Sequence, residues 1–337
     1  MNSLLIMGAG SVGCYLGGLL AAAGRTVHFV GRPHVLDGLR KHGLTTSDLE
    51  GRQFHLAGAN LNLHSILPEG LRPELTLLCV KSGATTEAAQ DLQQALPAGS
   101  LVLSMQNGIG NAERGAAAAP ALQWRAGMVP FNIAEQSPGH YHRGTTGALM
   151  VQGSLAETAL AGLQTAFAAQ GIKLQLRADL LAAQWGKLLL NLNNPVNALS
   201  GLALRDELLE RDYRRCFAAL QREALDLLDA AGMPAMTMTP LPHRLLIHLL
   251  GLPTPIFKLL AASMLKIDAK ASSSMADDLG RGRVTEIDAI CGEVIRLGQR
   301  LGRPAPLNSR MQELVQAWPQ HPQRFEPGEL MQALGVG

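Results

Sequence analysis

The feature that most constrains the fold is a glycine-rich turn near the start of the chain. Residues 3–7 predict a strand, residues 14–23 a helix closed by Gly24, and residues 26–30 a second strand. A strand, a GxGxxG turn and a helix in this order are typical of a Rossmann fold, in which the turn and the helix N-terminus hold a pyrophosphate. We therefore expect dinucleotide binding by the turn, whose residues are Gly8, Ala9, Gly10, Ser11, Val12 and Gly13.

The residues after the second predicted strand bear on which nucleotide binds. NAD-binding domains usually place an acidic residue there, and its carboxylate bonds the ribose 2′-hydroxyl. Here Gly31 and Arg32 hold this place. A guanidinium suits a 2′-phosphate, which a carboxylate would repel. We therefore expect NADP(H), although a solvated surface arginine is the alternative interpretation.

Two polar residues directly follow later predicted strands. Residues 75–80 and 100–105 are apolar runs that lead to Lys81 and to Gln106-Asn107-Gly108. In open parallel sheets, ligands bind beyond the carboxyl ends of the strands. We expect Lys81 near the phosphates or ribose and Asn107 on the nicotinamide side, although each could equally be a turn residue.

Strand and helix patterns divide the chain into two parts. Residues 39–63 predict short strands and turns, residues 155–170 a helix, and further strands are expected at 125–133, 145–152 and 173–176. Beyond residue 179 strand patterns end, and long helical runs follow at 180–199, 205–231 and 285–301. The predicted class is α/β: an N-terminal Rossmann dinucleotide-binding domain, residues 1–178, followed by an all-helical C-terminal substrate and catalytic domain, residues 179–337.

The first helix expected in the C-terminal domain carries polar residues in an apolar segment. Lys187, Asn191 and Asn194 stand at i, i+4 and i+7, so they share one face of a helix. A buried ammonium and buried amides are costly unless satisfied, so the face could be aimed at a small polar ligand. Pro195 cannot donate to the carbonyl of Asn191 and should bend the helix. The alternative is a snorkelling lysine with amides bonded to neighbouring loops.

A second constellation lies closer to the C-terminus. Residues 272–278 are rich in serine and aspartate, and they lead through a glycine-spaced segment into Thr285-Glu286-Ile287-Asp288. Thr285 suits an N-cap and Asp288 the third position of a capping box. Glu286 then lies in the first helical turn, where it could simply complement the helix dipole.

Composition narrows the function classes. The net charge of +2 and the 4% aromatic content argue against nucleic acid and membrane surfaces as partners. The four cysteines form no CxxC pair, and His140 and His142 lack an evident third ligand, so we expect free thiols and no metal. The apolar stretches 3–24 and 244–267 lack the features of a signal peptide and a membrane span. We expect a cytoplasmic protein.

These segments together resemble the ketopantoate reductase (2-dehydropantoate 2-reductase) family, in order and over nearly the whole chain. The resemblance rests on the glycine turn and on the segments Gly31-Arg32, Val80-Lys81, Gln106-Asn107-Gly108, 185–195, Ser273-Ser274-Met275 and Thr285-Glu286-Ile287-Asp288. It implies a Rossmann domain followed by a helical domain, with the active site in the cleft between them. It also implies NADPH-dependent reduction of a small 2-oxo acid, with 2-dehydropantoate to pantoate, on the route to pantothenate and coenzyme A, as the first candidate.

The resemblance further implies residue roles. Lys187 would be the general acid that protonates the ketone oxygen as hydride arrives, and Glu286 its acidic partner, which contacts substrate or cofactor. The substrate would be held by Asn107, Asn191, Asn194 and Ser274. The cofactor would contact Arg32, Lys81, Asn107 and the backbone of Ile133, which ends a predicted strand.

The substrate and some alternatives stay open at this point. Residues 233–271 look like a proline- and leucine-rich enlargement before Ser274, which could reshape the pocket. One alternative is another two-domain hydroxy-acid dehydrogenase with a different substrate. The other is a non-catalytic NADP-binding redox sensor, against which Lys187 and Glu286 argue, because a sensor needs no acid. A homodimer is a possible assembly.

Overall fold

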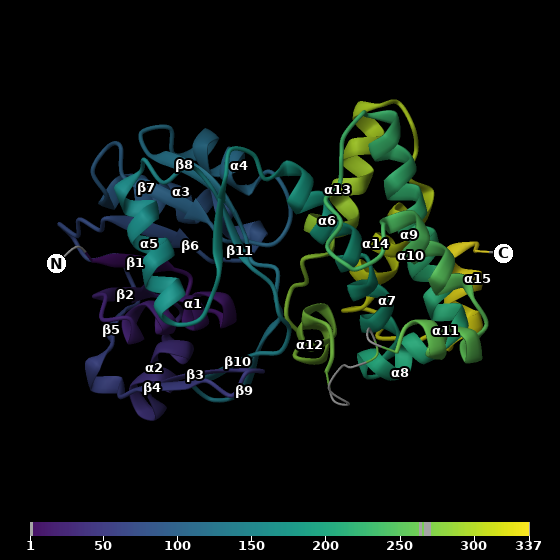
Figure 1. Cartoon of the computed structure of the whole chain (residues 1–337), viewed down its shortest axis with the longest axis horizontal. Helices are drawn as coiled ribbons and strands as arrows, with labels where there is room; N and C mark the ends of the chain where they lie inside the picture. The colour runs from purple at the N-terminus through teal and green to yellow at the C-terminus, as the bar shows by residue number, and fades with distance from the viewer. Residues whose placement is uncertain (1–2, 263–264, 266–270, 337) are drawn as a thin grey trace. The chain divides into compact units, whose positions relative to one another are not determined.

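The computed structural model describes residues 3–262, 265 and 271–336, and it divides into two compact units, Met1–Leu180 and Leu181–Gly337 (Figure 1). The first unit combines helices with sheets, and the described residues of the second unit form helices only. The predicted class, a Rossmann α/β domain followed by a helical domain, is confirmed.

The first unit is built on an eight-stranded sheet among its described residues. Its order is β5 (Asn62–His64), β2 (Val27–Val30), β1 (Leu4–Met7), β6 (Leu75–Leu78), β7 (Leu101–Ser104), β8 (Gln123–Met128), β11 (Leu149–Gln152) and β12 (Leu174–Arg177). Neighbouring strands are parallel except for the antiparallel pair β8 and β11. The first six strands follow the Rossmann order, whose direction reverses between β1 and β6, where nucleotides bind.

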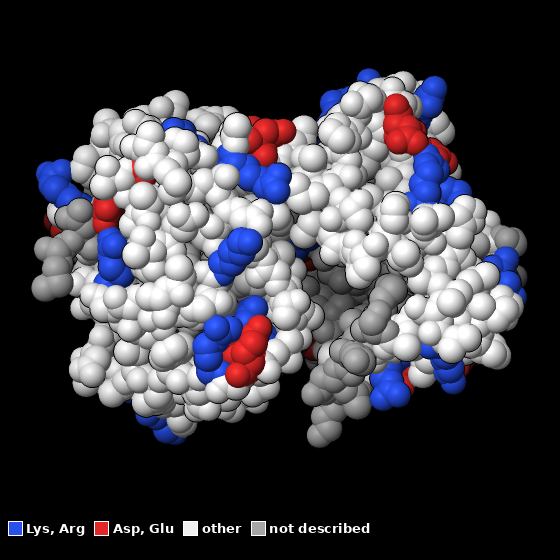
Figure 2. Space-filling model, viewed as in Figure 1, with Lys and Arg blue, Asp and Glu red and all other residues white. Residues whose placement is uncertain are grey.

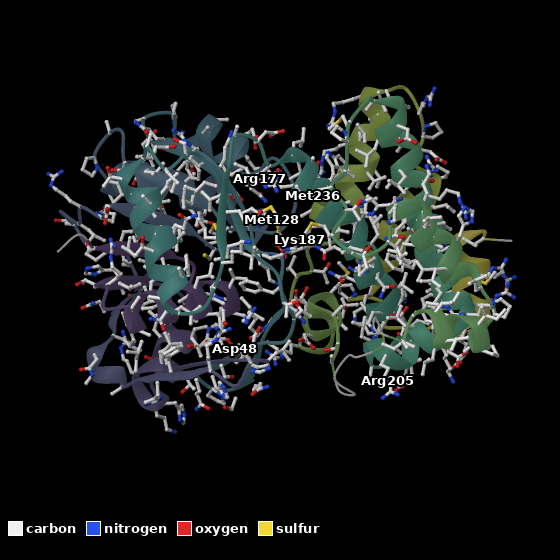
Figure 3. All side chains as sticks on the ribbon, in the orientation of Figure 1. Asp48, Met128, Arg177, Lys187, Arg205 and Met236 are labelled. Carbon is white, nitrogen blue, oxygen red and sulfur yellow. The ribbon has the colours of Figure 1, made fainter. Side chains whose placement is uncertain are left out.

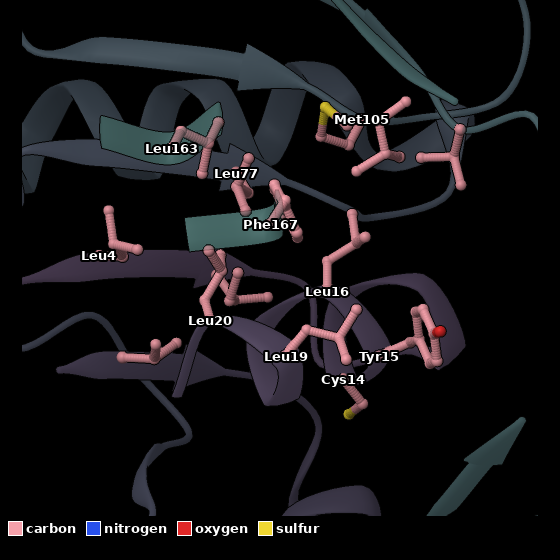
Figure 4. Close-up of a cluster of buried hydrophobic side chains, with 14 of the residues drawn as sticks. Leu4, Cys14, Tyr15, Leu16, Leu19, Leu20, Leu77, Met105, Leu163 and Phe167 are labelled. Carbon is pink, nitrogen blue, oxygen red and sulfur yellow. The ribbon is translucent and has the colours of Figure 1, made fainter. Parts of the chain in front are cut away.

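Each side of this sheet has its own apolar core, because successive side chains of a strand point to opposite faces. Leu4 and Ile6 join the cluster beneath α1 (Ser11–Ala22) and α5 (Thr158–Ala169), part of which Figure 4 shows. Leu5 and Met7 join the cluster on the other face, with side chains from α3 (Thr85–Ala95) and α4 (Asn111–Ala118). Burial on both faces explains why these strands are continuously apolar in sequence.

A second sheet in the first unit was only partly predicted. Its order is β4 (Gln53–Leu56), β3 (Leu44–Asp48), β10 (His140–Arg143) and β9 (Ile133–Ser137). The run predicted as strands and turns over 39–63 begins inside the helix α2 (Pro33–His42), and the single strand expected over 125–133 is the end of one strand and the start of another. Local patterns do not show these features, because β3 pairs with β10, whose residues are over 90 positions away.

The second unit is arranged around α9 (Arg211–Ala230). Among the described residues, seven helices pack on it: α6 (Leu181–Asn191), α7 (Asn193–Ser200), α8 (Leu204–Leu209), α10 (His243–Gly251), α13 (Ile287–Arg300), α14 (Pro306–Ala317) and α15 (Pro327–Leu334). α11 (Thr254–Leu260) contacts α10, and α12 (Ser274–Gly280) contacts α7. The helix predicted over 180–199 is interrupted at Leu192, close to the bend expected from Pro195.

The proline- and leucine-rich enlargement crosses α6 before it forms α10 and α11. The Met236 N–H donates to the Ala182 carbonyl at 2.7 Å. A Cβ on Gly186 would lie 2.0 Å from the Met236 carbonyl oxygen, so this crossing requires glycine at position 186. The enlargement therefore packs one residue away from Lys187, and both Met236 and Lys187 are labelled in Figure 3.

The charged side chains on the surface and the lengths of the helices bear on which partners the protein can have. On the face drawn in Figure 2, basic and acidic side chains are scattered, some singly and some in small mixed groups. Within the described part of the chain, no helix has the length and apolarity that a membrane span needs.

Candidate functional site

The glycine turn after β1 is shaped by close packing at its first and last glycines. Gly8 has a φ of +110°, and a Cβ there would lie 2.7 Å from the Val80 nitrogen. A Cβ on Gly13 would lie 2.1 Å from the Gly8 carbonyl oxygen. Both positions therefore require glycine for the protein's own packing.

Gly10 differs from these two glycines. A Cβ added there meets no atom within 4 Å, so the packing of the chain does not require glycine. Gly10 is the N-cap of α1, and no side chain caps that helix end. Open space above a glycine, at a helix N-terminus with its backbone N–H groups, is what close approach of a pyrophosphate needs. The turn therefore fits a dinucleotide.

The end of β2 lies against this turn. The N–H groups of Gly8 and Ala9 donate to the Val30 carbonyl, both at 2.9 Å. A Cβ on Gly31 would lie 2.5 Å from that of Ala9, so glycine at position 31 is what allows β2 to approach the turn. Arg32 follows at the N-cap of α2, with its side chain exposed.

Lys81 and Asn107 lie on the loops that follow β6 and β7. Lys81 is exposed. The Asn107 carbonyl accepts hydrogen bonds from Ser82 Oγ and Asn111 Nδ2, each at 2.8 Å. Gln106 is buried and donates to the Val80 carbonyl at 3.0 Å, which joins the two loops. Three supporting residues were not predicted, because single polar residues in loops carry no periodic signal: Ser82, Gln106 and Asn111.

The expectation for Ile133 was wrong in its structural premise. Ile133 does not end a strand; it begins β9, and it pairs with Arg143 of β10 in the four-stranded sheet. The strand expected to continue to Ile133 already ends at Met128, because the chain turns there from one sheet into the other. Ile133 therefore does not offer its backbone from the carboxyl end of a strand.

In the second unit, Lys187, Asn191 and Asn194 are all partly exposed, whereas Trp185, Leu188, Leu189 and Pro195 are buried. The break at Leu192 corrects the expectation of one continuous helical face, since Asn191 ends α6 and Asn194 lies in the first turn of α7.

The Lys187 ammonium is electrostatically perturbed. Burial lowers its pKa to about 8, and the carboxylate of Glu286 opposes that shift. The pKa falls because burial disfavours the charged form of a lysine. Lys187 therefore interacts with Glu286, although 99 positions separate the two residues in sequence.

The predicted capping of the helix near Glu286 was wrong. α13 begins at Ile287, and Glu286 itself occupies the N-cap position, without a side-chain cap. The Asp288 carboxylate does not return to Thr285; it accepts from Arg296 Nη1 at 3.0 and 3.1 Å. This pair spans Gly292, where a Cβ would lie 2.5 Å from Asp288 Oδ1. The competing arginine explains the error.

Ser274 begins α12, and the preceding Ser273 connects it to α7. Ser273 Oγ accepts from the Ala276 N–H at 3.1 Å and donates to the Asn194 carbonyl at 3.1 Å. The Ser273 N–H donates to Asn197 Oδ1 at 2.9 Å. The structure thus brings the serine segment together with Asn194, and the supports Ser273 and Asn197 were not predicted.

The two histidines that stand close together in the sequence lie on the four-stranded sheet. His140 Nε2 and His142 Nδ1 each lie 2.8 Å from Ser47 Oγ on the four-stranded sheet. Among the described residues, no group of three or more His, Cys, Asp and Glu side chains is arranged to hold a metal ion. All four cysteines are free thiols.

The strand order and the glycine turn define a dinucleotide-binding protein, and comparisons with known proteins identify its family. The model of the family "Ketopantoate reductase PanE/ApbA" matches residues 4–155, and that of its C-terminal part matches residues 179–318. The chain belongs to the ketopantoate reductase family and is an oxidoreductase, as predicted.

Individual relatives cover nearly the whole chain. The 2-dehydropantoate 2-reductase of Pyrococcus horikoshii is 26% identical over 93% of this chain and 96% of its own. The crystal structure of a PanE/ApbA family ketopantoate reductase from Ralstonia eutropha is 29% identical, with a TM-score of 0.77, and covers 93% of this chain and 97% of its own. D-Mandelate dehydrogenase, solved with NADH and anilino(oxo)acetate, shares the fold at 20% identity and a TM-score of 0.76, over 94% and 97% of the two chains.

Proposed function

We propose that this protein is an NADPH-dependent reductase of a small 2-oxo acid, with Lys187 as the general acid. The observation that carries the proposal is the Lys187 ammonium, whose pKa burial lowers to about 8 against the opposing effect of Glu286, on the helix that Asn191 ends, with Asn194 in the first turn of the next helix. A redox sensor has no use for such an acid.

We assign cofactor binding to the first unit, residues 1–178 of the sequence. The glycine turn and the N-terminus of α1 suit the pyrophosphate, and Arg32 and Lys81, both exposed beyond strand ends, suit the phosphates of NADP. Asn107, whose backbone Ser82 and Asn111 hold in place, suits the nicotinamide side. When bound, NADPH supplies the hydride.

We assign substrate binding and proton transfer to the second unit, residues 179–337. As hydride reaches the carbonyl carbon, negative charge grows on the ketone oxygen, and a positioned ammonium lowers the barrier by donating a proton to it. At pH 7 a lysine with a pKa near 8 is mostly protonated, yet it gives up its proton more readily than an ordinary lysine. Glu286 favours the charged form between turnovers.

Asn191, Asn194 and Ser274 are the proposed holders of the 2-oxo acid. Amides and a hydroxyl bond a carboxylate and a carbonyl without a second buried charge. The first candidate substrate is 2-dehydropantoate, which relatives at about 25% identity reduce according to their names. An aryl 2-oxo acid is the second candidate, because the fold also serves a mandelate dehydrogenase. Four free thiols suit a reducing compartment such as the cytoplasm.

The test is NADPH oxidation by the purified protein with a panel of 2-oxo acids. The panel holds 2-dehydropantoate, an unbranched, a branched and an aryl 2-oxo acid, each at several concentrations. We expect steady turnover with at least one member and the highest kcat/KM with 2-dehydropantoate. A higher kcat/KM with the aryl acid would replace the first candidate by the second. NADPH binding without turnover of any member would favour a sensor and contradict the proposal.

A further inference from the structure

A buried carboxyl group lies beside the proposed substrate-binding helices without an assigned role. Glu207 of α8 is fully buried, and Asn193, the first residue of α7, is 7% exposed. The Asn193 amide donates from Nδ2 to Glu207 Oε2 at 2.9 Å. Asn193 stands between Asn191 and Asn194, the two proposed substrate contacts, so it belongs to the junction of α6 and α7.

The remaining oxygens of this pair indicate its protonation state. Glu207 Oε1 and Asn193 Oδ1 are both buried, and no hydrogen-bond partner for either is found among the described residues. An ionised Glu207 would leave two acceptors unsatisfied, which is costly inside a protein. A carboxylic acid has an O–H that can donate to the amide oxygen while its other oxygen accepts from the amide N–H. The protonated form therefore matches donors to acceptors.

The charged and titratable groups around Glu207 do not supply a counter-ion. From α9, Arg214 faces it, but this guanidinium donates to the carbonyls of Leu208, Leu250 and Leu252. A negative charge on Glu207 would raise the pKa values of Tyr213 and Cys216 of α9. From α7, the neutral Asn197 amide favours the charged form of Glu207 by hydrogen bonding, and it also donates to the Leu202 carbonyl at 3.1 Å. Burial raises the pKa of Glu207 to about 8, against the opposing effects of Asn193, Arg214 and Asn197.

We propose that Glu207 is protonated in the folded enzyme, pairs with Asn193 as a carboxylic acid with an amide, and so positions the α6–α7 junction for substrate binding. The last part rests on the proposed function, because it needs Asn191 and Asn194 to hold the substrate. The first part does not.

Hydrogen bonds connect the Glu207–Asn193 pair to the backbone on both sides of the α6–α7 junction. The carboxyl fixes the first residue of α7 from the buried side, and one turn later Asn197 Oδ1 accepts from the Ser273 N–H. Ser273 Oγ in turn donates to the Asn194 carbonyl. On the other side of the break, Gln221 Nε2 donates to the Leu189 carbonyl at 2.9 Å. These bonds hold the backbone that presents Asn191 and Asn194, so Glu207 is a positioning residue.

The protonation is tested by unfolding Glu207→Gln and the wild type as a function of pH. A glutamate in the unfolded chain loses its proton near pH 4, whereas the folded Glu207 keeps it up to about pH 8. Between these values the folded state binds the extra proton, so this group makes the wild type lose stability as pH rises. Glutamine keeps both hydrogen bonds and does not titrate.

The unfolding midpoint of Glu207→Gln, relative to the wild type, should therefore rise from about pH 4 and level off above pH 8. Glu210→Gln, which removes an exposed carboxylate just after α8, is the matched control and should show no such rise. A difference for Glu207→Gln that is flat or that falls with pH would show an ionised Glu207 and overturn the protonation.

The positioning role is tested by kinetics with a 2-oxo acid that the enzyme turns over. Glu207→Ala should raise KM for the 2-oxo acid about 10-fold or more, since small misplacements of contact groups are costly, and leave KM for NADPH unchanged. In the wild type we expect KM for the 2-oxo acid to rise above pH 8, where Glu207 loses its proton. Glu207→Gln should restore KM and remove that rise, whereas the fall of kcat expected from deprotonation of Lys187 should remain in both proteins.

Two results would contradict the positioning role. One is a Glu207→Ala variant that unfolds earlier but keeps its KM for the 2-oxo acid. The other is equal change in the KM values for NADPH and 2-oxo acid. If no 2-oxo acid is reduced, the proposed function and the positioning role fail together, and the unfolding comparison still decides the protonation.

Discussion

The glycine turn of the first unit and the Lys187 face of the second unit are built in opposite ways. By the Lys187 face we mean Lys187 with Asn191, Asn194, Ser274 and Glu286. The turn uses the backbone of six consecutive residues, and its glycines are needed because a Cβ at Gly8 or Gly13 would overlap backbone atoms. The Lys187 face uses side chains from α6 and α7, with Glu286 and the serine segment reached only after a long stretch of chain. One is a local conformation, and the other is a tertiary assembly of polar groups.

The two regions should therefore be sensitive to different substitutions. Backbone N–H groups bind a pyrophosphate whatever the side chains are, provided that no Cβ intrudes, so the turn should tolerate polar changes but not added bulk. The Lys187 face depends on one cation whose pKa is set by burial, and on amides that distant residues hold. Loss of a single functional group should therefore impair this face more than a change in side-chain size.

The largest expected effect comes from Lys187→Met. If Lys187 is the general acid, kcat should fall by ~10²–10⁴, whereas NADPH affinity should stay near that of the wild type, because the cofactor is assigned to the other unit. Single-turnover kinetics and NADPH titration measure the two quantities. Lys187→Arg serves as a control that keeps the charge but donates a proton poorly. Normal turnover by Lys187→Met would remove Lys187 from the chemistry.

The next effect compares two glycines of the same turn. Gly13→Ala places a Cβ 2.1 Å from the Gly8 carbonyl oxygen and should lower the free energy of unfolding by ~1–3 kcal/mol or more. Gly10→Ala meets no protein atom within 4 Å, so its stability should change by less than ~0.5 kcal/mol while NADPH binding weakens. Chemical denaturation and NADPH titration distinguish these outcomes. Equal loss of stability in both variants would show that Gly10 serves the fold and not the cofactor.

Arg32→Ala tests the assignment of the 2′-phosphate. A hydrogen bond between charged groups contributes about 1.5–3 kcal/mol, so KM for NADPH should rise roughly 10–100-fold and KM for NADH should hardly change. The measurement is kcat/KM with both cofactors at fixed salt. Arg40→Ala removes another exposed arginine of the same helix, one that pairs with Asp37, and should leave the preference intact. A wild type that uses NADH as well as NADPH would rule out this role for Arg32.

The smallest effects are expected from the proposed substrate holders. Asn191→Ala, Asn194→Ala and Ser274→Ala should each lower kcat/KM for the 2-oxo acid by an amount equivalent to ~1–3 kcal/mol, with NADPH binding unchanged. Initial rates and thermal unfolding should be measured on the same preparations. Variants that unfold early but keep wild-type kinetics would show that these groups support the fold, as the alternative interpretation of the helix holds.

Much of the first unit could be predicted because its information is local. Neighbouring residues indicate each of its features: the positive φ at Gly8, the apolar strand buried on both faces and the helix after the turn. The second sheet leaves little mark, because β3 finds its partner β10 only when the chain folds back. Ile133 was misplaced for that reason: its position depends on which sheet the chain enters after Met128.

The Rossmann unit, the helical unit and the bend near Pro195 could be predicted from residue patterns, because spacing and backbone conformation act over a few residues. Tertiary packing was needed to place Glu286 at the N-cap of α13 and to turn Asp288 to Arg296. It alone decided the environment of Glu207 as well. A carboxyl in the sequence is indistinguishable from any other until folding removes its water, and burial then sets which of its forms the protein can hold.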